Sequence, residues 1–84
     1  MGEIKIIKSG EDERVTFVAE ISEERLVPRF EEEIKGILTK YSVFISSKNQ
    51  RIVVDAPALY RNYVELILGE AAKRQGLKIK FKED

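Results

Sequence analysis

The segment from Asp55 to Leu68 constrains the fold most, because as a helix it is apolar on more sides than one small core can cover. Helical spacing divides the apolar side chains of this segment and the residues after it between two adjacent stripes. One stripe contains Leu59, Tyr63, Leu66 and Ile67, and the other contains Tyr60, Val64, Leu68, Ala71 and Ala72. We expect one stripe to face the core and the other to bind a second protein. The residues assigned to that partner surface are Tyr60, Val64, Leu68 and Ala72.

Length and composition predict a single domain, residues 1–84. A chain of 84 residues can bury only a modest core, and 43% apolar with 36% charged residues suits a small folded domain that stays soluble. Asn and Gln occur twice each, Cys is absent, and Lys and Glu are abundant. That composition is typical of proteins from thermophiles.

The charged and reactive side chains argue against an enzyme. Lys plus Arg and Asp plus Glu number 15 each, so no net charge draws the chain onto a polyanion. Without His or Cys there is no imidazole base, thiolate or Cys/His zinc site. The acidic runs 11–13, in a polar turn, and 31–33, on a helix, are both expected to be exposed. In the second run, consecutive helical residues diverge by about 100° and cannot chelate one ion together. We predict no catalytic residue, cofactor or metal site.

The hydropathy pattern contains neither a run of signal-peptide character nor an apolar stretch of the roughly 20 residues that span a bilayer. We therefore expect a cytoplasmic protein without a membrane partner.

Alternation and turn residues predict two hairpins, each followed by a helix. The first hairpin pairs residues 3–8 with 14–20, and the second pairs 42–46 with 51–55. Ser22 is expected to cap a helix whose main part spans about 28–40, with Pro28 either kinking an early turn or starting that main part. Gly76 is expected to end a helix over about 57–75 in a left-handed conformation. A last strand follows at 77–82. The order ββαββαβ predicts an α+β two-layer sandwich, with an antiparallel or mixed sheet and both helices on one face.

The last strand alternates strictly, so Leu77, Ile79 and Phe81 are expected to face the core while three lysines face water. Those lysines, together with two cations of the second hairpin, are candidate phosphate contacts. The five residues are Lys78, Lys80, Lys82, Lys48 and Arg51. A solvated edge strand that discourages unwanted pairing explains the lysines equally well. The alternative function from these residues is a small autonomous RNA-binding module with a basic edge strand, although no exposed aromatic pair or GxxG loop accompanies them.

The order of elements and the two helix openings resemble a known family, the small dimerising subunit of the archaeal KEOPS tRNA-modification complex. The first helix opens with residues 21–24, Ile-Ser-Glu-Glu, and the second with residues 55–59, Asp-Ala-Pro-Ala-Leu. Asp55, Ala58 and Leu59 fit the family's pattern, and the resemblance covers about residues 3–75. Tyr60 stands where the family prefers Arg, and Val64 and Glu65 stand where it has Asn and Ser. The strand from residue 77 is a further departure.

The resemblance implies a divergent paralogue with a non-catalytic assembly or regulatory role. Such a chain would pair with the small subunit of the complex that installs the threonylcarbamoyl group on adenosine in tRNA, while catalysis lies in another subunit. The family pairs side by side through its sheets and contacts the catalytic subunit through its helices. A heterodimer with the small subunit is the expected assembly, with a homodimer left open, and contact with tRNA is expected to be indirect or weak.

Overall fold

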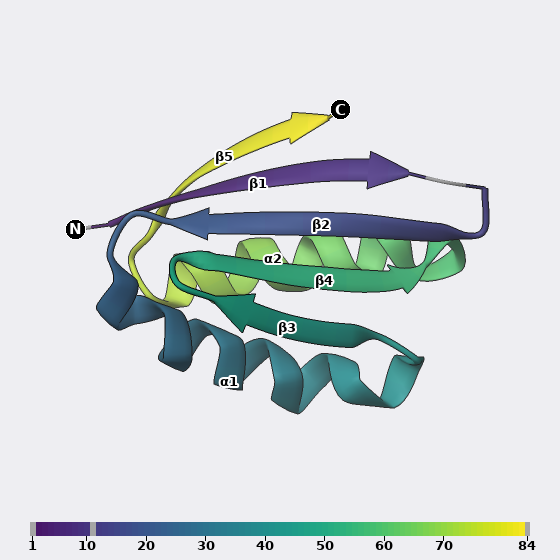
Figure 1. The fold of residues 1–84 in the computed structure, drawn as a ribbon, viewed down its shortest axis with the longest axis horizontal. Coiled ribbons are helices and arrows are strands. Elements are labelled where there is room, and N and C mark those ends of the chain that lie inside the picture. Colours follow the sequence, from purple (N-terminus) through teal and green to yellow (C-terminus); the bar gives the residue numbers. More distant parts are fainter. Residues whose placement is uncertain (1, 11, 84) are drawn as a thin grey trace.

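The computed structural model describes residues 2–10 and 12–83, with the backbone alone for Lys40. Its elements follow the predicted order ββαββαβ (Figure 1). The strands are β1 (Glu3–Gly10), β2 (Arg14–Ile21), β3 (Phe44–Lys48), β4 (Arg51–Pro57) and β5 (Lys78–Glu83). The helices are α1 (Val27–Leu38) and α2 (Arg61–Arg74), with single 3-10 turns at Glu24–Leu26, Thr39–Tyr41 and Ala58–Tyr60.

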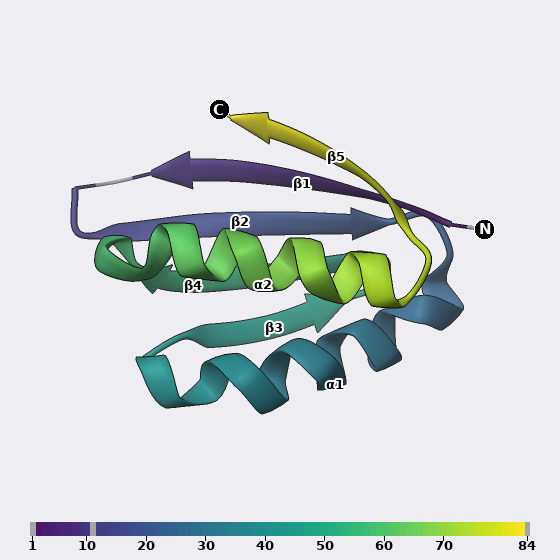
Figure 2. The same ribbon diagram turned by 180° about the vertical axis from the view of Figure 1, so that it is seen from behind.

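The five strands form one mixed sheet in the order β3-β4-β2-β1-β5. All neighbours are antiparallel except β1 and β5, which are parallel with Ile4 opposite Ile79. The last strand therefore pairs within its own chain. Both helices lie on the same face of the sheet, as the view from behind shows (Figure 2).

The core lies between the sheet and the helices. Strand β2 alternates without interruption, so that Val15, Phe17, Ala19 and Ile21 point toward the helices and are buried. Helix α1 contributes Val27, Phe30, Ile34 and Leu38 from positions spaced three or four residues apart, which lie on one face of a helix. The predicted two-layer α+β architecture is thus confirmed. The alternation of the strands and the three-to-four-residue spacing of the helices bury their apolar side chains in one shared layer.

The two apolar stripes of α2 are real, but the prediction of which one faces outward is wrong. Val64, Leu68 and Ala72 are completely buried within the monomer, so they cannot form a partner surface. The small side chains of Ala71 and Ala72 let that side of the helix approach the sheet closely, which favours burying it. The predicted partner residue Tyr60 is half-buried, with its ring centroid 5.4 Å from that of Tyr41.

Helix ends differ from the predicted ones in two places. The Ser22 hydroxyl accepts a hydrogen bond of 2.8 Å from the Glu3 backbone N–H and caps no helix, so the residue ties the start of β1 to the end of β2. Pro57 ends strand β4, and a 3-10 turn separates it from α2. Gly76 has φ of +70°, as predicted for a left-handed cap.

The inward side of β5 is covered only in part. Leu77 is buried and Ile79 half-buried, whereas Phe81 is 51% exposed, contrary to its predicted core position. An added Cβ at Gly69 would lie 3.9 Å from the Phe81 ring, so α2 runs beside this ring. The ring stays half open because β5 is the edge strand and no further strand of the described chain lies beyond it.

Truncating Leu68 should destabilise the protein much more than truncating Leu66 on the same helix. Leu68→Ala removes a fully buried side chain and should cost about 2–5 kcal/mol of unfolding free energy. Leu66→Ala acts at a 57% exposed position and should cost no more than about 0.5 kcal/mol. Urea unfolding of the two variants measures the difference. Equal losses would contradict the observed rotation of α2.

Glu33 of α1 is bound to Arg74 of α2 and to Gln75, and its protonation should lower the stability of the protein in acid. Burial raises the pKa of Glu33, but hydrogen bonds from Gln75 and Arg74 outweigh burial and bring the pKa below its ordinary value of 4.5. A lowered folded-state pKa stabilises the protein above pH 4.5, and this contribution is lost as the pH falls through the folded-state value. Stability of Glu33→Gln, measured by urea unfolding, should therefore fall less on acidification than that of the native chain. Glu32→Gln, an exposed neighbour, should keep the native acid sensitivity.

Candidate functional site

The face of the sheet opposite the helices carries most of the strand charges. No helix of the described chain covers this open face, which is turned toward the viewer in Figure 1. Because alternate residues point to opposite sides of a strand, the charged residues on this face can be assigned. The cations are Lys5, Arg14, Lys48, Arg51, Lys78, Lys80 and Lys82, and the anions are Glu3, Glu20 and Asp55. A chain with equal numbers of both signs therefore presents a basic surface on one side.

Five of these charges form a single row across all five strands. The registers place Lys80 beside Lys5, Lys5 beside Glu20, Glu20 beside Arg51, and Arg51 beside Lys48. With strands about 4.8 Å apart, the row extends about 19 Å across the sheet. We refer to Lys80, Lys5, Glu20, Arg51 and Lys48 as the charged row.

The one carboxylate of the charged row is already engaged. Glu20 Oε2 accepts hydrogen bonds from Arg51 Nη2 at 2.7 Å and from Arg51 Nε at 3.2 Å. Among the described residues, Lys5, Lys48 and Lys80 have no carboxylate oxygen within 4.0 Å. Three lysines of the row are therefore not paired with a carboxylate of the described chain and are available to bind an anionic ligand.

Like charges lie directly side by side at two points of the row. Lys5 is the cross-strand neighbour of Lys80, and Arg51 is the cross-strand neighbour of Lys48. Like charges at such positions destabilise a sheet. The fold thus carries a cost here that a bound anion would relieve.

The charged row borders a hollow of about 680 Å³ at one end of the open face. All five residues of the row line it, along with polar groups of the β3–β4 turn and the neighbouring ends of β1 and β2. In the turn, Gln50 Nε2 donates hydrogen bonds to the carbonyl oxygens of Ile21 (3.2 Å) and Ser22 (2.8 Å). These bonds fix the turn that joins Lys48 to Arg51, so two cations of the hollow are held by a braced hairpin.

The five predicted phosphate-contact residues all lie on the open face, but the structure separates them. Lys48, Arg51 and Lys80 line the hollow, whereas Lys78 and Lys82 lie outside its lining on the edge strand. Lys5 was not predicted. Its alternation with Ile4 and Ile6 indicated an outward side chain, but its place beside Lys80 depends on the parallel pairing of β1 with β5.

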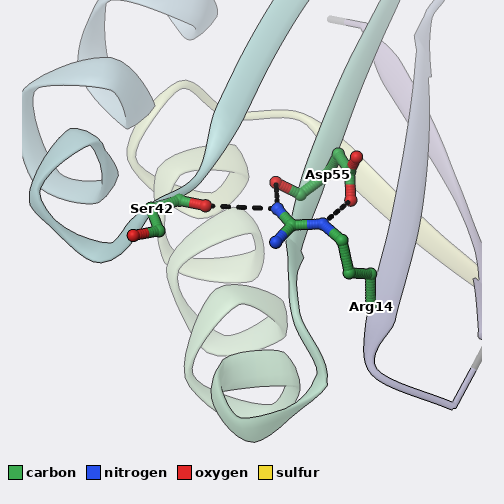
Figure 3. Close-up of polar contacts among 3 residues, drawn as sticks. All are labelled: Arg14, Ser42 and Asp55. Carbon is green, nitrogen blue, oxygen red and sulfur yellow. Dashed lines mark hydrogen bonds and ion pairs between the residues drawn. The ribbon is translucent and has the colours of Figure 1, made fainter.

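At the opposite end of the open face, Arg14 is bound to Asp55 and Ser42 (Figure 3). Its Nε donates a 2.9 Å hydrogen bond to Asp55 Oδ1, and its Nη2 donates to the carbonyl oxygens of Ser42 at 3.2 Å and Asp55 at 3.3 Å. The guanidinium carbon also lies 5.4 Å from the centroid of the Phe44 ring, which is 67% exposed. The charge of Arg14 is thus satisfied within the fold, unlike the charges of Lys5, Lys48 and Lys80 at the hollow.

The outer side of the helix layer carries a second surface of a different character. Leu59 is 84% exposed, Leu66 57% and Tyr63 37%, at spacings that align them along one side of the helix and its preceding turn. We refer to these three residues as the outer stripe. The Tyr63 ring packs edge-on against Tyr41, with centroids 5.3 Å apart, which connects the stripe to the end of α1.

No family model and no curated protein matches this chain. Within the described part of the chain, no three acidic side chains are grouped as a metal site would require. No helix of the described residues is long and apolar enough to cross a membrane. The open face and the outer stripe are the two surfaces from which a function can be inferred.

Reversing one charge of the row should stabilise the protein. Lys80→Glu replaces the Lys5–Lys80 neighbours by an opposite-charge pair, so the unfolding free energy should rise by about 0.2–1 kcal/mol at low salt. Added salt should shrink this gain. Lys82→Glu on the same strand lies opposite Ile7 and should give a smaller change in the same urea unfolding assay. An equal gain from both variants would show that the paired lysines do not repel measurably.

Proposed function

We propose that this chain is a non-catalytic assembly subunit that pairs with the small subunit of the KEOPS complex. The outer stripe carries the proposal. Single exposed apolar residues are ordinary on protein surfaces, but Leu59, Tyr63 and Leu66 are aligned on one side of α2 and the turn before it. Aligned anchors of this kind are what a helix presents when it docks in a partner's groove.

The stripe has the composition of a binding surface as well as the geometry. Tyrosine is enriched among the residues that dominate binding energies, and its ring offers a large contact area with few rotatable bonds. The Tyr63 ring packs edge-on against Tyr41, and this contact reduces the side-chain freedom that would be lost on binding. The hairpin–helix–hairpin–helix order, one of the two features on which the family resemblance rests, is the order of β1 to α2. The cytoplasmic location expected from the sequence is part of the proposal.

The surface proposed to bind the small subunit lies on the helix layer, unlike the sheet-to-sheet pairing that the family resemblance implies, and its residues are corrected here. The outer stripe takes the place of Val64, Leu68 and Ala72, because these three side chains already pack in the core. Tyr60 remains at the border of the proposed surface through its contact with Tyr41.

Leu66→Asp and Leu59→Asp should each weaken assembly and together abolish it, because a carboxylate would have to be desolvated at the contact. Light scattering after size exclusion, on the chain alone and mixed with the KEOPS small subunit, measures this directly. The native chain should form a stable one-to-one species with that subunit. Asn49→Asp adds the same charge at an exposed position of the β3–β4 turn, away from the outer stripe, and should assemble normally.

Two other outcomes of this experiment are informative. A homodimer of the chain alone that Leu66→Asp disrupts would keep the stripe as an interface but replace the proposed partner with a second copy. A monomer that ignores the small subunit at micromolar concentration would overturn the proposal.

A further inference from the structure

We propose that the open face binds single-stranded nucleic acid, with backbone phosphates on the lysines of the charged row and one base stacked on Phe44. This site lies on the opposite side of the sheet from the outer stripe. It is therefore independent of the proposed assembly role.

Charge complementarity is the first argument for this ligand. Lys5, Lys48 and Lys80 lack carboxylate partners among the described residues and line one hollow. Lysines that neutralise backbone phosphates release the counterions condensed on the nucleic acid, and this release supplies sequence-independent affinity. The neighbouring lysines Lys5 and Lys80 repel one another, and that repulsion falls when an anion lies between them.

Phe44 is the second argument, because it adds a stacking surface to the same face. Its position in β3 places it on the open side with Lys48, four residues further along the strand and about 13 Å away. Arg14 lies near the ring, which nevertheless remains 67% exposed. Exposed aromatic rings beside cations are typical of proteins that bind unpaired bases.

The shape of the face favours a single strand over other polyanions. A duplex is read by an element that enters a groove, and the open face is a sheet without a projecting helix. On the central strands, Ile7, Val18 and Val53 are half-buried, so they offer little apolar surface to insert into a lipid layer. One stacking ring and a row of lysines predict binding without sequence preference.

The test uses the full chain and fluorescein-labelled oligouridine, with affinity measured by anisotropy over a range of salt concentrations. The triple variant Lys5→Gln, Lys48→Gln, Lys80→Gln should lose at least about a hundredfold in affinity at low salt. Its salt slope should fall in magnitude by about 2, as expected for three phosphate contacts on a single strand. The control Arg29→Gln, Arg61→Gln, Lys73→Gln removes the same charge from exposed positions of the helix layer and should change neither quantity appreciably.

Phe44→Ala tests the stacking part of the proposal separately. It should weaken oligouridine binding by about 5- to 150-fold while leaving the salt slope unchanged, since a stacked base contributes no counterion release. Leu59→Ala, which shortens an exposed apolar residue on the other layer, should bind as the native chain does. Urea unfolding confirms that each variant remains folded.

Several results would overturn the inference. Equal losses of oligouridine affinity in the charged-row variant and in the helix-layer control would show that only the net charge of the protein matters. Preference for an RNA duplex, or binding to phosphatidylserine vesicles without binding to oligouridine, would assign the face to another ligand. Because Leu66→Asp should bind oligouridine normally, failure of the assembly proposal would leave this result intact.

Discussion

Strand β2 is the element on which the rest of the structure depends. It pairs with β1 on one side and with β4 on the other, and its strict alternation separates the buried side of the sheet from the charged side. A shift of one residue would exchange those sides, bringing Phe17 into water and Glu20 into the core. The energy of burying Phe17 and its apolar neighbours therefore also fixes where the charges of the open face lie.

The positions of charge and of apolar surface follow from that division of the sheet. Helices cover one side, so the residues that point to the other must be polar or be partly covered by their neighbours. Here cations outnumber anions on the open side even though the chain as a whole is neutral. The helix layer meets water through its own outer side, where α2 shows the stripe that the core does not use. Two chemically different surfaces thus arise on opposite layers of a very small protein.

Alternation, helical spacing and turn residues predicted the strands and helices well. The features that the sequence did not predict depend on contacts between residues far apart in the chain. Alternation located the hairpins, helical spacing located both helices, and Gly76 marked the end of α2 as expected. The rotation of α2 depends on how closely each stripe can approach the sheet, which periodicity alone does not determine. Lys5 and Phe44 joined the candidate site only because pairing across the sheet puts them on the face shared with Lys48 and Lys80, and no short motif encodes that arrangement.

The parallel pairing of β5 also has a consequence for how such sheets can extend from one molecule to the next. By placing its own last strand against β1, the chain satisfies backbone donors and acceptors that a neighbouring molecule would otherwise occupy. The edge strand on that flank is therefore β5, and sheet growth between molecules can proceed only past β5 or from the short strand β3 at the far flank. The lysines of β5 discourage such pairing, so the chain replaces the edge of β1 with an edge that is less prone to strand addition.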